Sequence, residues 1–321
     1  MTELSTPRDQ RRQYSHIGWV MTMMLVFSIL LPNISAIIAK VLWPNYTGNM
    51  WAVFAVNYGL FYLLGYPYAC LMMRLRTVGV PPKANMKPLQ FCAALPVCIT
   101  LMYAGSLLGN MLNAVIGVLR GEMPTNDLQG MLENTDTGVV ILFVVILGPL
   151  MEELLFRKAL VDVLYPLGET ACVLLGGLIF GLIHGNFYQF FYAFLIGGLF
   201  TLIYCRTGKV RYTVVLHMLV NLQGSVLAPW ILSLLDTTAL EEGNYAQLLA
   251  DNPFGLLLYM GYCLLMLALA AAGVALLILG FKKMRPKKSA VPLFHPLRTA
   301  LINPGIIVFL IAGLAMILYR F

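Results

Sequence analysis

Charged side chains are scarce in this chain. Asp, Glu, Lys and Arg make up 11% of its 321 residues, whereas 60% are hydrophobic. A soluble globular domain has about a quarter of its residues charged, so the composition excludes that class. Long apolar runs predict an all-α polytopic membrane protein with about eight or nine transmembrane helices. The nine expected spans are residues 17–39, 51–73, 91–119, 138–164, 170–185, 187–205, 212–235, 254–281 and 305–319.

The few charges alternate in sign between successive connections. Basic residues occupy positions 8–12, 74–87, 157–158, 206–211 and 282–288, and acidic residues lie within 122–136 and 236–251. The net charge of +7 is therefore explained by the positive-inside rule, and no nucleic-acid partner is expected. We expect an integral protein of the plasma membrane that contacts lipid, with residues 1–16 as a cytoplasmic tail. Nine spans would place the C-terminus outside.

Cysteine is also sparse. The six cysteines lie in or at the ends of apolar spans, which favours buried apolar side chains over disulfides, so no disulfide partner is expected. The first apolar run has no small-residue cleavage site, so we interpret it as a retained anchor. We find no internal repeat and no long linker, and residues 1–321 are expected to form a single membrane domain.

Two adjacent carboxylates, Glu152 and Glu153, nevertheless lie inside the fourth expected span. A charge at the centre of a bilayer costs roughly 2.5 to 3.5 kcal/mol, so both need a partner or a function. Residues four apart share a helical face, and Arg157 is therefore expected to pair with Glu153. Glu152 then has no cation, and burial disfavours its ionised form. We expect Glu152 to take a proton from water as a general base.

Two histidines and an asparagine follow this pair. His184 ends the fifth expected span, and His217 and Asn221 lie one turn apart on the seventh. Two roles for the imidazoles remain open. With Glu152 and Asn221 they could bind a divalent ion such as Zn²⁺, or they could donate hydrogen bonds to a developing oxyanion. The other two histidines lie at a membrane boundary and in a basic loop and are not expected in the site: His16 and His295.

The depth of His184 does not fit simple straight spans. With a rise of about 1.5 Å per residue, His217 and Glu152 reach a similar level, but His184 lies roughly 10 Å too deep. We therefore expect the sixth span to be short or re-entrant near residues 185–191. Glycines at positions 177, 181 and 185 recur every fourth residue and predict close packing of one face of the fifth helix against a neighbour.

Three motifs resemble those of a known family. The segments EELLFR at 152–157, FGLIH at 180–184 and HMLVN at 217–221 are similar to the EExxxR, FxxxH and HxxxN motifs of CPBP intramembrane proteases. This family, also called Abi, is named for CAAX-processing and bacteriocin-processing members and is related to type II CAAX prenyl endopeptidases. The resemblance covers about residues 138–222, which it implies are the catalytic core. Carried over by motif position, the site residues are Glu152, Glu153, Arg157, His184, His217 and Asn221.

The resemblance implies a helical membrane protease in which Glu152 activates water and the other five residues support or complete the site. It leaves open whether such an enzyme uses a metal. We expect an intramembrane endopeptidase that cleaves a membrane-associated protein or peptide near the cytoplasmic face, among the fourth, fifth and seventh helices. Two alternatives remain: a proton- or ion-coupled transporter, since Glu and His also form proton relays in membranes, and an inactive scaffold.

Overall fold

The computed structural model describes residues 4–122, 130, 135–287, 289 and 292–319. These residues form helices and turns without any β-strand, which confirms the predicted all-α class. Residues 1–3 of the expected tail lie outside the described residues. So do three charged residues of the alternating connections: Asp127, Glu133 and Lys288.

Six helices are long and apolar enough, by length and composition, to cross a membrane. This confirms an integral multi-pass membrane protein. The six are α1 (Pro7–Leu42), α4 (Pro88–Arg120), the continuous helix Thr137–Leu167, α10 (Phe187–Thr207), the continuous helix Val210–Leu232 and α15 (Pro253–Met284).

Three further helical segments fall on the remaining expected spans. Two are shorter apolar helices, α9 (Glu169–Leu182) and α17 (Pro304–Tyr319). The third is the run formed by α2 (Met50–Leu60), the π-helical η2 (Phe61–Gly65) and α3 (Tyr66–Met73). Helices thus occur at all nine expected places, while the number that cross the membrane stays a prediction.

Two of the long helices change their winding along their length. Thr137–Leu167 comprises α6 (Thr137–Val139), η3 (Val140–Leu147), α7 (Gly148–Glu153), η4 (Leu154–Val161), α8 (Asp162–Leu164) and η5 (Tyr165–Leu167). Val210–Leu232 comprises α11 (Val210–Leu222), η6 (Gln223–Leu227) and α12 (Ala228–Leu232). The segments η3, η4 and η6 are π-helical, a winding that is frequent near functional sites. The short α7, which carries both glutamates, lies between two of them.

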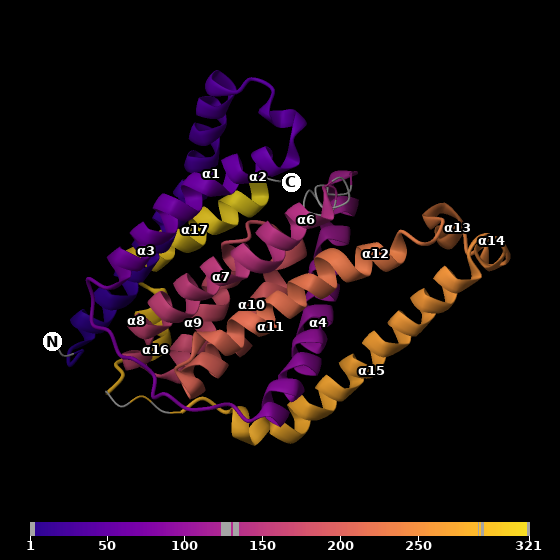
Figure 1. The fold of residues 1–321 in the computed structure, drawn as a ribbon. Coiled ribbons are helices and arrows are strands. Elements are labelled where there is room, and N and C mark those ends of the chain that lie inside the picture. Colours follow the sequence, from indigo (N-terminus) through magenta and orange to yellow (C-terminus); the bar gives the residue numbers. More distant parts are fainter. Residues whose placement is uncertain (1–3, 123–129, 131–134, 288, 290–291, 320–321) are drawn as a thin grey trace.

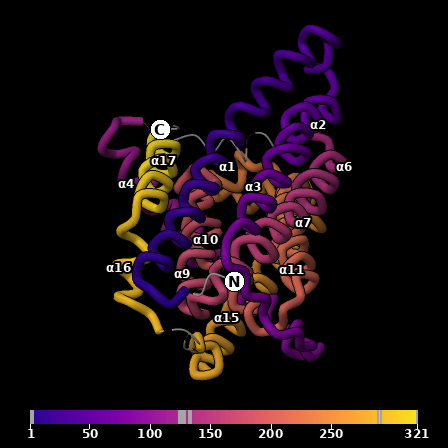
Figure 2. The backbone as a smooth tube through the Cα atoms, turned by 90° about the vertical axis from the view of Figure 1, so that its left-hand side faces the viewer, coloured from indigo at the N-terminus to yellow at the C-terminus, as the bar shows by residue number. Residues whose placement is uncertain are grey.

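The helices of the predicted core occupy the middle of the molecule. In Figure 1, α7, α9, α10 and α11 lie between a group made of α1, α2, α3 and α17 and a pair made of α4 and α15. Figure 2 shows the first group from the side, with α1 beside α17. The remaining short helices lie in the connections: η1 (Tyr46–Gly48), α13 (Thr237–Glu241), α14 (Tyr245–Asp251) and α16 (Pro296–Leu301).

Polar caps set the starts of α1 and α10. Thr6 accepts a hydrogen bond from the backbone of Asp9, so α1 begins at Pro7, inside the segment that we expected to be a tail. Asn186 caps the start of α10 by accepting from the backbone N–H of Gln189 at 2.9 Å. These caps satisfy N–H groups that a helix leaves free in its first turn.

We expected the sixth helix to be short or re-entrant, but the fifth helix is the shorter of the two. α9 has 14 residues and α10 has 21. Gly185 has a φ of +64°, a left-handed conformation that glycine adopts readily, and it turns the chain before Asn186. Gly185 therefore lies in the turn. A Cβ on Gly177 or Gly181 would lie 2.7 or 2.8 Å from a backbone oxygen of α10, so the predicted close approach occurs at these two glycines.

Candidate active site

The two adjacent glutamates occupy different environments at the end of α7. The side chain of Glu153 is fully buried, whereas that of Glu152 is 26% exposed. Arg157 binds Glu153 with two hydrogen bonds, from Nε to Oε2 at 2.9 Å and from Nη2 to Oε1 at 3.1 Å. The predicted pairing of Glu153 with Arg157 is therefore confirmed. Because the guanidinium of Arg157 forms this bidentate contact with Glu153, it does not pair with Glu152.

Aromatic and hydroxyl groups complete the surroundings of Arg157, which is itself fully buried. Its Cζ atom lies 4.8 Å from the ring centroid of Phe180 and 5.7 Å from that of Phe200. Its Nη1 donates to Thr201 Oγ1 at 3.5 Å. A buried guanidinium needs such partners on every side, and these contacts tie the fourth expected span to α9 and α10.

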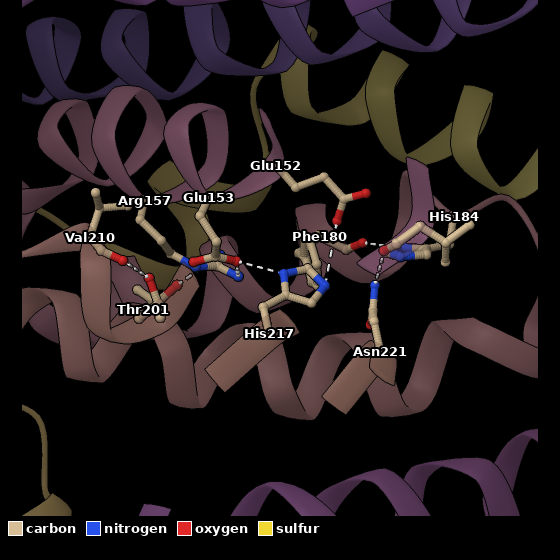
Figure 3. A network of polar contacts seen from close by, with 11 residues as sticks. Glu152, Glu153, Arg157, Phe180, His184, Thr201, Val210, His217 and Asn221 are labelled. Atoms are coloured by element: carbon tan, nitrogen blue, oxygen red, sulfur yellow. Dashed lines mark hydrogen bonds and ion pairs between the residues drawn. The ribbon is translucent and has the colours of Figure 1, made fainter. Parts of the chain in front are cut away.

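The imidazole of His217 reaches both glutamates from α11. Its Nδ1 lies 3.1 Å from Oε1 of Glu153, and its Nε2 lies 3.8 Å from Oε2 of Glu152 (Figure 3). The carboxylate of Glu153 only accepts hydrogen bonds, so Nδ1 of His217 donates the proton. In the neutral ring, Nε2 then has its lone pair toward the cavity side and Glu152.

The second histidine follows the last turn of α9. Nδ1 of His184 lies 2.7 Å from the backbone oxygen of Phe180, which is also an acceptor. Nδ1 therefore carries the proton here too, and Nε2 of the neutral ring is free to accept. The ring packs edge-on against Phe180 at a centroid distance of 5.0 Å, and Phe180 also contacts the ring of His217 at 5.8 Å. Phe180 thus fixes the spacing of the two imidazoles.

Asn221 lies one turn beyond His217 on α11. Its Nδ2 donates to the backbone oxygen of Val144 at 2.9 Å. Val144 belongs to η3, where the π winding precedes α7. This bond fixes the amide and leaves the second N–H and the side-chain oxygen of Asn221 for another partner.

One cavity of about 420 Å³ connects four of the six predicted site residues. Residues from α1, α2, η2, η3, α9, α10, α11 and α17 also contribute to its walls. Glu153 and Arg157 lie buried beside the cavity, where they contact His217 and Thr201 (Figure 3). Four of the predicted site residues therefore share one cavity. The four residues that line it are Glu152, His184, His217 and Asn221.

Several polar residues of the cavity wall were not predicted. Tyr58 and Tyr62 come from α2 and η2, and Gln189 and Tyr192 come from α10. Asn186, Gln189 and Tyr192 recur at intervals of three at the start of an apolar helix, and this spacing is the sequence signal that could have identified them.

The other two histidines belong to α1 and to the connection before α16. His16 in α1 contacts the backbone oxygen of Met72 through Nε2 at 2.8 Å. His295 precedes α16. Neither is among the residues that line the cavity.

The predicted metal ligands do not form a coordination sphere as placed. Within the part of the chain that the structure describes, no three His, Cys, Asp or Glu side chains form a group that could hold a metal ion. The contact between Nε2 of His217 and Oε2 of Glu152, at 3.8 Å, is wide. A role for a metal here stays a prediction.

Known proteins resemble part of this chain. Residues 134–223 match the family described as "Type II CAAX prenyl endopeptidase Rce1-like". Over 161 residues, the chain is 22% identical to a Bacillus subtilis (strain 168) protein named "Putative membrane peptidase YdiL". This match covers 48% of the chain and spans only 65% of the length of that relative. No solved structure matches the chain. Together with the three motifs, these matches support a CPBP-family assignment for the Rce1-like segment, residues 134–223.

Proposed function

We propose that this protein is an intramembrane endopeptidase that hydrolyses a peptide bond in a membrane-associated protein or peptide near the cytoplasmic face of the plasma membrane. The observation that carries the proposal is the difference in environment between two neighbouring carboxylates. Glu153 is buried against Arg157, while Glu152 lines a cavity that His184, His217 and Asn221 also line. The family match and the name of the relative support membrane proteolysis.

In the proposed reaction Glu152 is the general base. It takes a proton from a water molecule while the water oxygen attacks the carbonyl carbon of the substrate. The carbonyl oxygen becomes the oxyanion of a tetrahedral intermediate. The C–N bond then breaks, the leaving nitrogen takes the proton from Glu152, and the carboxylate is restored.

The neighbouring groups have supporting roles in this proposal. Asn221 has one N–H on Val144, and its other N–H is available to the substrate oxygen. Glu153 holds His217 through Nδ1, so that Nε2 faces Glu152 and orients the attacking water. His184 has its Nδ1 proton on Phe180, so Nε2 of its neutral ring accepts a hydrogen bond from water or substrate.

The divalent metal ion remains a separate prediction, and none of these steps passes through it. Metal analysis of the purified protein tests it. About one Zn²⁺ per chain in the wild type, lost in His184→Ala and His217→Ala, would support a metal site. A wild-type protein with no more metal than these variants would contradict it.

Comparative proteomics of membranes tests the proposed function. Membranes that contain the wild type, Glu152→Gln or Glu242→Gln are searched for new peptide termini. Glu242 makes the matched control because it is an exposed glutamate after α13. We expect new termini with the wild type and Glu242→Gln but not with Glu152→Gln, because the carboxamide cannot take a proton from water. The same termini with Glu152→Gln would contradict the proposal.

The two alternatives predict different results. A transporter would show gradient-driven uptake in proteoliposomes that is lost in Glu152→Gln, without new peptide termini. A scaffold would keep its cellular role in the Glu152→Gln protein. Either pattern would replace the endopeptidase proposal.

A further inference from the structure

A chain of hydrogen bonds runs from the turn after α9 into the cavity. Nδ2 of Asn186 donates to the backbone oxygen of His184 at 3.0 Å and to Oε1 of Gln189 at 2.8 Å. Nε2 of Gln189 then donates to the hydroxyl oxygen of Tyr192 at 3.0 Å. Gln189, Tyr192 and His184 all line the cavity that contains Glu152. The chain therefore links the backbone of one predicted site residue to a phenol in the cavity wall.

The direction of every bond in this chain is fixed by a backbone group. The N–H of Gln189 can only donate, so Oδ1 of Asn186 is the atom that caps it. Nδ2 of Asn186 must then face Oε1 of Gln189, which turns Nε2 of Gln189 toward Tyr192. Because the hydroxyl oxygen of Tyr192 accepts this bond, its own hydrogen stays available to donate. Within the described part of the chain, no residue accepts that hydrogen.

Packing holds the backbone of Tyr192 in place. A Cβ added to Gly105 of α4 would lie 2.3 Å from both N and Cα of Tyr192, so the two helices are in direct backbone contact there. The phenol and Glu152 line the same cavity. A donor on a rigid helix, aligned before the substrate arrives, is the kind of group that stabilises developing negative charge at low reorganisation cost.

We propose that Tyr192 is a further catalytic residue, which donates its hydroxyl hydrogen to the oxyanion of the tetrahedral intermediate. The proposal rests on the proposed endopeptidase function. No bond to hydrogen is broken at Tyr192: the O–H donates while the oxyanion exists, and releases the oxygen when the C–N bond breaks and the carbonyl reforms. Gln189 is a positioning residue, because its amide occupies the phenol oxygen and directs the hydrogen into the cavity.

Two other phenols in the cavity wall lack this arrangement. The rings of Tyr58 and Tyr62 pack against each other at 5.6 Å, and Tyr58 also stacks on Phe143 at 6.2 Å. Among the described residues, neither hydroxyl has a hydrogen bond that sets its direction. Tyr192 is thus the phenol whose donor orientation the protein determines.

The test measures cleavage kinetics of purified Tyr192→Phe in proteoliposomes. The probe is a synthetic membrane peptide that contains the cleavage site found in wild-type membranes. Phenylalanine keeps the ring and removes only the donor, so we expect kcat to fall on the order of 10²-fold with KM nearly unchanged. Tyr68→Phe is the matched control, because the Tyr68 ring packs on Phe27 and is not in the cavity wall.

A second variant, Gln189→Glu, tests the direction of the bond. A carboxylate can only accept, so it draws the hydrogen of Tyr192 away from the substrate while keeping the length of the side chain. We expect a fall in kcat similar to that of Tyr192→Phe. The double variant should be no slower than either single variant, because both changes remove the same hydrogen bond.

The outcomes separate this inference from the proposed function. An active wild type, an inactive Glu152→Gln and a Tyr192→Phe with the wild-type kcat would overturn the role of Tyr192 alone. Additive losses in the double variant would overturn the role of Gln189 in directing that hydrogen. Equal cleavage by Glu152→Gln and the wild type would overturn the endopeptidase mechanism, and the inference with it.

Discussion

The Nδ1 atom of His217 lies 3.1 Å from the Oε1 atom of Glu153, so a buried carboxylate on α7 orients an imidazole on α11. This contact joins two motifs that are 64 residues apart in sequence. It also explains why a glutamate that does not line the cavity belongs to the site. Glu153 determines which nitrogen of His217 carries the proton.

Replacement of His217 should therefore abolish most activity without unfolding the protein. His217→Asn removes the ring that faces Glu152, while Glu153 keeps both hydrogen bonds to Arg157. We expect kcat to fall about 10²-fold or more, with little change in the unfolding temperature. His295→Asn is the matched control, since His295 is exposed and has a φ of +45° that asparagine tolerates. Wild-type kcat in His217→Asn would refute a role in water orientation.

Loss of Glu153 should destabilise the fold. Glu153→Gln leaves the guanidinium of Arg157 buried without its counterion, which costs about 3 kcal/mol of unfolding free energy. Adding Arg157→Met removes that charge and should restore part of the loss, because the two residues form one ion pair. Unfolding of Glu153→Gln, Arg157→Met and the double variant in detergent gives the comparison. Strictly additive destabilisation in the double variant would show that the pair does not act as a unit.

Close packing of α9 on α10 should also be sensitive to volume. A Cβ at Gly177 would meet the backbone oxygen of Phe194 at 2.7 Å, so Gly177→Ala must push the helices apart. We expect a loss of about 1 to 3 kcal/mol in stability and lower activity, because His184 follows α9 directly. Gly261→Ala on α15 is the control, as its Cβ would have no neighbour within 4 Å. Equal stability of the two variants would contradict the close approach.

The amide of Asn221 should not be replaceable by a carboxylate. Nδ2 of Asn221 donates to the backbone oxygen of Val144, and in Asn221→Asp an acceptor would face that oxygen. We expect Asn221→Asp to lose about 1 to 3 kcal/mol of stability and to be less stable than Asn221→Ala, which only leaves the oxygen unpaired. Thermal unfolding of both variants measures this difference. The reverse order would place the Asn221 amide away from Val144.

Part of the site could be predicted from the spacing of residues along a single helix. The four-residue spacing of Glu153 and Arg157 correctly predicted their ion pair, since this contact depends on one helix alone. The contact of His217 with both glutamates depends on how α11 packs against α7, which no local pattern specifies. Tyr192 was missed for a similar reason: its role depends on three successive hydrogen bonds and on the approach of α4.

Hydrophobicity predicted where the helices lie more reliably than how long they are. Helices occur at every expected span, but α9 ends at Leu182 because Gly185 and Asn186 form the turn into α10. A window of apolar residues does not register such a turn. His184 lies next to this turn and lines the same cavity as Glu152 and His217.

The rate of peptide cleavage by purified Glu152→Gln tests the central claim most directly. The wild type, Glu152→Gln and the exposed control Glu242→Gln are compared in proteoliposomes with the same membrane peptide. The account predicts a loss of at least about 10²-fold in Glu152→Gln, with Glu242→Gln equal to the wild type. Cleavage by Glu152→Gln at the wild-type rate would contradict it, because no proton acceptor would then be needed at Glu152.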